Sequence, residues 1–149
     1  MTEIQFLGSS KPFSMPREIE EKGGFFFEQG VSFFVQDLVA YWIGIMQPFF
    51  TMPYLYEARG LGNKNFWAYI EHYMELGDVI KLYHIPVQNW YQDSIRKMID
   101  DPQPISINIG SRTYENVYGT FMLKEKNVIE ELSHRTLVTE YGITTFLRY

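Results

Sequence analysis

The feature that most constrains the fold is a long stretch that is almost free of charge, residues 25–56. Between Glu28 and Glu57 the sequence carries one charged residue, Asp37. A stretch of this length and composition is compatible with three roles. It can cross a membrane, form part of a buried core, or present an apolar surface to a partner.

The most apolar window of this stretch, residues 31–50, makes a poor membrane span. A spanning helix needs about 20 mainly apolar residues, and an aspartate near the bilayer centre costs about 2.5–3.5 kcal/mol. No basic cluster flanks the window to orient it. Polar residues and a proline interrupt it at Ser32, Gln36, Asp37, Gln47 and Pro48. We therefore expect no membrane association, and we place residues 25–46 in the protein core.

The last part of the stretch, residues 46–56, is less constrained. Pro48 and Pro53 interrupt regular backbone hydrogen bonding, so we expect irregular backbone that displays several large rings. Such rings are either packed against the rest of the protein or used for binding. The sequence pattern does not decide between these alternatives.

The length of the chain suits a single domain over residues 1–149. A chain of 149 residues can bury a core without disulfides or metals, and the sequence shows no internal repeat, low-complexity tract or linker. Aromatic residues make up 17% of it, and each buried ring removes about 150–250 Å² from water. We expect rings to dominate the core, the alternative being that some form a pocket or an oligomer interface.

Charge and cysteine content exclude several classes of protein. The net charge is −5, and the lysines and arginines are scattered, whereas a nucleic-acid-binding protein needs clustered cations. The absence of cysteine excludes disulfides, thiolate metal sites and cysteine nucleophiles. It also fits a reducing compartment, and the first residues lack the basic and apolar segments of a secretory signal. We therefore expect a cytoplasmic protein that does not bind nucleic acid.

Two helices are expected in the middle of the chain, at about 64–76 and 88–100. In the first, Phe66, Ile70 and Met74 belong to an apolar stripe with three- and four-residue spacing. Gly77 follows at a position suited to a left-handed helix end. In the second, Trp90, Ile95 and Ile99 form a similar stripe, and Pro102 helps to end it.

Strands are expected on both sides of these helices. Residues 105–109 alternate apolar and polar side chains, and the segments 112–123 and 135–149 are rich in residues that favour strands. Residues 4–7, 31–36 and 78–87 also predict strands, with residues 25–28 as the hairpin partner of 31–36. Strands, then helices, then strands indicate an α+β fold. We expect a largely antiparallel sheet with the two helices packed on one face.

Polar clusters give only weak candidates for chemistry. Residues 7–11, Leu-Gly-Ser-Ser-Lys, follow a predicted strand and can bind an anion, but the P-loop spacing is absent. His72 and Glu75 lie three residues apart on the first predicted helix, but they lack the further converging ligands that a metal site needs. We therefore expect neither a metal nor a cofactor. The weak catalytic candidates are His84, His134, Arg135 and Glu140.

Candidate binding residues come from two regions. One is the aromatic segment 46–56, and the other is 108–119, which mixes Tyr, Ser, Asn, Gly and Arg as recognition surfaces do. The candidates are Phe49, Phe50, Tyr54, Tyr56, Arg112, Tyr114 and Tyr118.

The leading hypothesis is therefore a small binding protein that contacts a protein partner or associates with itself through an aromatic-rich surface. Immunity, inhibitor and accessory proteins of bacteria and phages have this size and chemistry. The absence of a specific catalytic motif favours a protein that is not an enzyme. The alternative is a small enzyme or ligand-binding domain, with an aromatic-lined pocket and polar groups from His134, Arg135 and Glu140.

Overall fold

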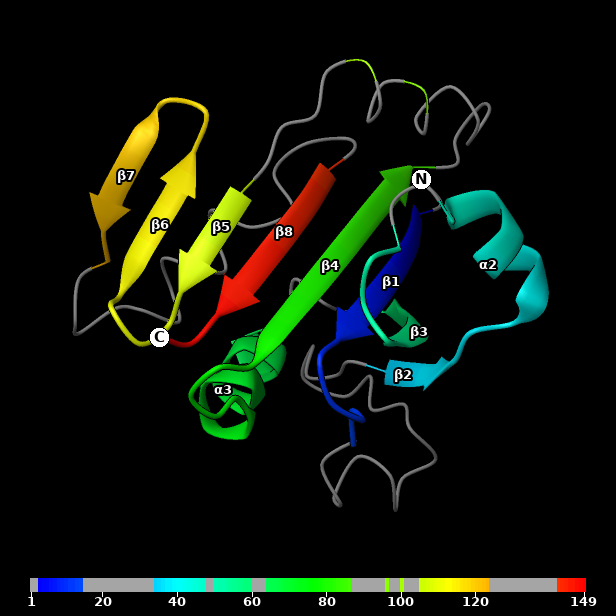
Figure 1. Ribbon diagram of the computed structural model, residues 1–149, viewed down its shortest axis with the longest axis horizontal. Coiled ribbons are helices and arrows are strands. Elements are labelled where there is room, and N and C mark those ends of the chain that lie inside the picture. Colours follow the sequence, from blue (N-terminus) through cyan, green and yellow to red (C-terminus); the bar gives the residue numbers. More distant parts are fainter. Residues whose placement is uncertain are drawn as a thin grey trace.

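The part of the chain that the structure describes forms one mixed sheet of eight strands, seen in the computed structural model in Figure 1. The structure describes residues 3–14, 34–47, 50–59, 64–86, 96, 100, 105–123 and 142–149. Within these residues the strand order is β2-β3-β1-β4-β8-β5-β6-β7. The strands are β1 (Glu3–Ser9), β2 (Phe34–Asp37), β3 (Tyr54–Arg59), β4 (Val79–Pro86), β5 (Ile105–Asn108), β6 (Thr113–Asn116), β7 (Gly119–Met122) and β8 (Gly142–Leu147).

The fold agrees with the predicted α+β class, although the sheet outweighs the helices. The described helices are short: α2 (Ala40–Met46) and α3 (Lys64–Tyr73). Neighbouring strands run antiparallel except β5 and β8, which are parallel. The sheet is thus largely antiparallel, as expected. None of the described helices has the length and apolar character needed to cross a bilayer.

Most elements expected from the periodicity are present. Strand β1 covers 4–7, β4 covers nearly all of 78–87, and β5 covers most of 105–109. The segment 112–123 forms the hairpin β6–β7, and α3 corresponds to the first predicted helix. Strand β8 forms the end of 135–149 and β2 the end of 31–36, whereas residues 25–28 lie outside the described residues. So does nearly all of the second predicted helix, 88–100.

The two faces of the sheet carry different apolar clusters. On one face Phe66 and Ile70 of α3, with Met74 just after it, pack against Leu7 and the other buried residues of what we call the main core. The remaining members of the main core are Phe13, Ala58, Ile80, Leu82, Ile105, Ile107, Tyr114, Leu123 and Phe146. On the other face, the second core joins Met46 of α2 to Phe6, Tyr83 and Ile85.

The two described helices therefore lie on opposite faces of the sheet. The expectation that the helices at 64–76 and 88–100 share one face stays a prediction, because nearly all of 88–100 lies outside the described residues. Successive side chains of a strand point to opposite faces. Phe6 and Leu7 are neighbours in β1, yet Phe6 belongs to the second core and Leu7 to the main core. In β4, Leu82 and Tyr83 divide in the same way. Because the central strands are buried on both sides, each face needs its own cover.

Where it is described, the charge-poor stretch is only partly core, contrary to the expectation for residues 34–46, whereas residues 25–33 lie outside the described residues. In α2, Met46 is fully buried and Trp42 and Ile45 are partly buried against the second core. The opposite side of the segment is exposed, at Val39, Tyr41 and Ile43. The irregular backbone expected for 46–56 is also wrong at its end, where residues 54–56 begin β3. Pro53 precedes this strand and so does not interrupt its ladder.

Two glycines differ in how closely other atoms approach them. A Cβ atom on Gly110 would overlap the backbone of Tyr149, whose oxygen, carbonyl carbon and amide nitrogen are the nearest atoms. A Cβ atom on Gly44, in α2, would meet nothing within 4 Å. These positions form a matched pair for substitution.

We expect Gly110→Ala to lower the free energy of unfolding by about 1–3 kcal/mol, since the backbone around Tyr149 must shift. Gly44→Ala should raise it by up to about 1 kcal/mol, because alanine is the better helix former. Urea denaturation followed by circular dichroism measures both. Equal midpoints for Gly110→Ala and the parent would contradict the close approach.

Candidate functional site

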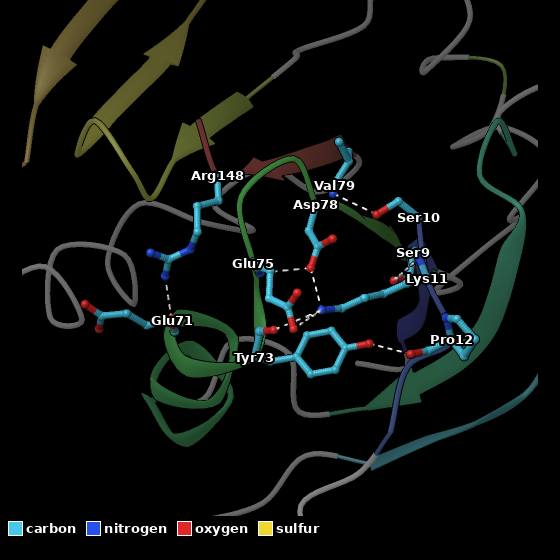
Figure 2. Close-up of polar contacts among 10 residues, drawn as sticks. All are labelled: Ser9, Ser10, Lys11, Pro12, Glu71, Tyr73, Glu75, Asp78, Val79 and Arg148. Atoms are coloured by element: carbon cyan, nitrogen blue, oxygen red, sulfur yellow. Dashed lines mark hydrogen bonds and ion pairs between the residues drawn. The ribbon is translucent and has the colours of Figure 1, made fainter.

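The most connected polar group is the Lys11 cluster, formed by Lys11, Tyr73, Glu75 and Asp78 and drawn in Figure 2. The ammonium of Lys11 lies 2.6 Å from a carboxylate oxygen of Asp78 and 3.6 Å from one of Glu75. It also donates to the carbonyl oxygen of Tyr73 at 3.3 Å and lies 4.5 Å from the centroid of that ring. The cluster thus joins the segment after β1 to the end of α3 and the start of β4.

The segment after β1 is held further by tyrosine hydroxyls. Tyr73 donates to the carbonyl oxygen of Pro12 and Tyr69 to that of Ser14. The hydroxyl of Tyr56 accepts from the amide of Phe13 at 2.9 Å. The ring of Phe13 packs against the rings of all three tyrosines, with centroid separations of 5.0–6.2 Å. The rings bury the apolar surface while their hydroxyls satisfy the irregular backbone.

A tight turn presents Asp78 to Lys11. Gly77 has φ +91°, a conformation that favours glycine, and Asp78 accepts from the Glu75 amide at 2.9 Å. Partial burial of Asp78 opposes its charge, but the hydrogen bonds from Lys11 and from that amide lower the pKa of the carboxyl. The hydrogen bond to Asp78 likewise raises the pKa of Lys11, against partial burial.

The pKa of the Tyr73 phenol, in the same region, is also shifted. Burial, followed by the neighbouring Tyr69 and Asp78, raises the pKa of Tyr73 to about 12. It is therefore a neutral donor at any physiological pH. The surroundings argue against the weak candidate for an anion site at residues 7–11, because two carboxylates already compensate the charge of Lys11. We interpret the cluster as a structural anchor.

The catalytic candidates are not brought together in the described part of the chain. His84 is 7% exposed and lies on the same side of β4 as Ile80 and Leu82, as the alternation predicts. His134, Arg135 and Glu140 lie outside the described residues. Among the residues that the structure describes, no three histidine, aspartate or glutamate side chains are grouped as metal ligands.

The candidate binding residues divide between core and surface. Tyr114 is buried in the main core, and Tyr56 is partly buried against it. Phe50 packs its ring on Phe6 and Tyr83 in the second core. Arg112 is half-buried with φ 56° in the turn before β6. Tyr54 and Tyr118 are exposed, whereas Phe49 lies outside the described residues.

The structure adds residues that the sequence reasoning missed, next to Tyr118. Of the ten large apolar side chains that are exposed in the described residues, four lie within 117–122. The exposed fractions are 53% for Val117, 86% for Tyr118, 43% for Phe121 and 71% for Met122. We call these four residues the hairpin patch. A signal was present, because no charged residue occurs between Glu115 and Lys124.

The hairpin patch lies at one end of the sheet. β7 is the last strand in the order and pairs with β6 on one side (Figure 1). All four of its residues are exposed. Phe121 stands opposite Tyr114, so its ring lies on the main-core face, whereas Met122 points to the other face. The site is therefore an uncharged strand edge with apolar side chains on both faces.

The geometry of the Lys11 cluster predicts how the contribution of Asp78 to stability depends on pH. We expect Asp78→Asn to lower the free energy of unfolding by about 1–2 kcal/mol at pH 7, because Lys11 loses its nearest carboxylate. The folded-state pKa of Asp78 is lowered from 3.8. Its contribution is therefore present above that value and is lost as the pH falls through the folded-state pKa. The difference from the parent should shrink below about pH 4.

Urea denaturation at pH 7 and pH 3 measures this difference. Glu75→Gln is the matched control: its carboxylate lies 3.6 Å from Lys11 on a side chain that is 83% exposed. We expect it to have little effect on stability. Equal losses for the two variants, or a loss at Asp78 that does not depend on pH, would contradict the anchor.

Comparisons with models of protein families, with curated proteins and with solved structures gave no match. No function is therefore transferred to this chain from a relative.

Proposed function

We propose that this protein acts by binding a protein surface through the hairpin patch at the β7 end of the sheet. The observation that carries the proposal is the exposure of the whole of β7, with Phe121 and Met122 on it and Tyr118 beside it. A binding role agrees with the leading hypothesis from the sequence. The cytoplasmic location and the immunity-, inhibitor- or accessory-type role stay predictions.

The chemistry of β7 favours binding over a purely structural role. Edge strands of monomeric proteins commonly carry charges, prolines or bulges that prevent pairing with another chain. β7, with the sequence Gly-Thr-Phe-Met, contains no charge and no proline. An added strand would bond to its backbone, and the exposed side chains would supply apolar contact area. Large exposed rings are also typical of residues that dominate binding energy.

A second exposed apolar set, on and beside α2, supports binding less well. Val39, Tyr41 and Ile43 are exposed on or beside α2, and α2 lies toward the other end of the sheet from β7 (Figure 1). They offer apolar side chains, but a helix presents no strand edge with which a partner strand could pair. This set therefore serves as a control for nonspecific apolar contact.

The alternative of a small enzyme or ligand-binding domain stays a prediction. Three of its polar residues, His134, Arg135 and Glu140, lie outside the described part of the chain. The fourth candidate, His84, is buried in the middle of the sheet. Among the described residues, no observation favours this alternative over binding at the hairpin.

The test compares two doubly substituted variants of the tagged protein. Phe121→Lys with Met122→Lys introduces charge on the hairpin patch, and Tyr41→Lys with Ile43→Lys does so on α2. Each is used to capture proteins from the native host, followed by mass spectrometry, after circular dichroism has shown that it is folded. Sedimentation velocity measures self-association in parallel.

We expect the parent and the α2 variant to retain the same interaction, with another protein or with a second copy. The hairpin variant should weaken it at least about tenfold, since buried lysines would lose their hydration. An interaction that survives in the hairpin variant and is lost in the α2 variant would overturn the proposal. So would the absence of any interaction in the parent.

A further inference from the structure

We propose that the partner of β7 is a second copy of this chain, paired antiparallel to it about a two-fold axis at Phe121. The inference rests on the proposed function and names the partner. It follows from which backbone groups of β7 face outward, from the symmetry of that pattern about Phe121, and from the absence of charge on the strand.

The hydrogen bonds of the β6–β7 hairpin fix which groups face outward. The amide of Leu123 donates to the carbonyl oxygen of Arg112 at 2.7 Å. In an antiparallel pair, directly opposite residues alternate between bonded and non-bonded pairs. Arg112 and Leu123 form a bonded pair, so Thr113 and Met122 do not, and Tyr114 and Phe121 do. The N–H and C=O groups of Phe121 therefore face β6.

The residues on either side of Phe121 have the opposite orientation. Thr120 stands in the non-bonded pair with Glu115, and Met122 in that with Thr113. The N–H and C=O groups of Thr120 and Met122 therefore point to the outer edge. Within the described residues no strand pairs with that edge. β7 thus presents two donors and two acceptors, placed symmetrically about Phe121.

This pattern is complementary to itself. If a two-fold axis passes beside Phe121, Thr120 of one copy faces Met122 of the other. Each such pair exchanges two hydrogen bonds, so four bonds use all eight outward groups of the two strands. An axis at Thr120 or Met122 would pair only that residue with itself and would leave the other to residues beyond β7. The axis at Phe121 is the one that β7 satisfies alone.

The side chains agree with the same axis. The two copies of Phe121 would form a non-bonded pair, in which side chains are closest, with Cα atoms about 4.5 Å apart. Both rings would lie on the main-core face, because each stands opposite a buried Tyr114. Cross-strand aromatic pairs stabilise a sheet. On the other face, Met122 would lie beside Thr120 of the second copy.

Charge favours this partner as well. Each chain carries a net charge of −5, so two copies repel over most of their surfaces. β7 carries no charge, and its pairing places no like charges directly opposite each other. Because the remaining repulsion is screened by salt, the dimer should tighten as the ionic strength rises. A basic partner attracted to the acidic chain would show the reverse.

The length of the edge sets the strength of the dimer. Four residues at about 3.4 Å each span about 14 Å, so the contact falls below the roughly 800 Å² per partner of a standard interface. We therefore expect a weak dimer that depends on protein concentration.

Cysteine cross-linking tests the register, and the chain has no cysteine of its own. Under mild oxidation Phe121→Cys should form a disulfide dimer, because its two copies would be direct neighbours, whose Cα separation lies within the range that a disulfide spans. Thr120→Cys alone should not, since its copies would lie about 8 Å apart, counting two residues along the strand. A mixture of Thr120→Cys and Met122→Cys should form the mixed dimer. Leu76→Cys, an exposed site outside the sheet, is the control for random collision.

Analytical ultracentrifugation tests the backbone pairing without a disulfide. Met122→Pro removes an outward N–H group and should be tolerated, because proline is accepted where an edge N–H faces solvent. We expect it to weaken the dimer at least about tenfold, since the symmetric interface loses two hydrogen bonds. Met122→Val keeps the N–H group and controls for loss of the methionine side chain. Thermal melting shows that both variants are folded.

The outcomes separate this inference from the proposed function. Selective cross-linking at Phe121, with a dimer that Met122→Pro weakens more than Met122→Val, supports both. A monomer at every concentration whose hairpin still captures another protein overturns the inference and leaves the proposed function standing. A monomer whose captured proteins are unaffected by the hairpin variant overturns both. Cross-linking at Leu76 as fast as at Phe121 overturns the inference.

Discussion

The pairing of β1 with β4 is the interaction on which the rest of the structure depends. All seven residues of β1, from Glu3 to Ser9, face partners in β4, from Pro86 to Ile80. The two strands lie inside the sheet, with β3 beyond β1 and β8 beyond β4. They contribute to both apolar cores. The central pairs, such as Phe6 with Tyr83 and Leu7 with Leu82, are therefore buried, so α2 and α3 have apolar surfaces to pack on.

The Lys11 cluster extends this pairing beyond the end of β1. Ser10 and Val79 continue it through two hydrogen bonds of 3.0 Å, one from each amide. Lys11 then reaches Asp78, and Tyr73 of α3 holds the carbonyl oxygen of Pro12 (Figure 2). Tyr69 of α3 likewise holds the carbonyl oxygen of Ser14. An ion pair and hydrogen bonds from aromatic side chains thus hold the irregular segment after β1 in place. The most closely connected polar groups among the described residues thus hold the fold together.

The two ends of the sheet differ from its centre and from each other. At the β2 end, Gln36 and Asp37 are exposed, and a polar edge of this kind discourages pairing with another chain. At the β7 end the strand has no charge and an exposed aromatic ring. Binding at the β7 end would extend a sheet whose central strands are already fully paired. The proposed function and the proposed dimer both use the part of the sheet that the core does not stabilise.

The sequence by itself determined the local elements. The stripe of Phe66, Ile70 and Met74 specified α3, and the alternation of Ile105 and Ile107 specified β5, because period is a local property of side-chain spacing. The polar interruptions of 31–50 likewise argued against a membrane span. The bounds of the helix Ala40–Met46 were not predicted, because Val39 before it provides no capping side chain to mark its start.

Only the tertiary structure decided which residues meet and which stay exposed. Tyr114 and Tyr118 are the same type of residue and lie close together in the sequence. Tyr114 is nevertheless buried in the core, and Tyr118 is exposed on the surface. The difference arises because Tyr114 faces Ile107 of the neighbouring strand, while Tyr118 lies in the turn beyond the ladder. In the same way, Lys11 is an anchor rather than an anion site because folding brings Asp78 to it. Strand order and side-chain partners depend on contacts between distant segments, which spacing along the chain does not encode.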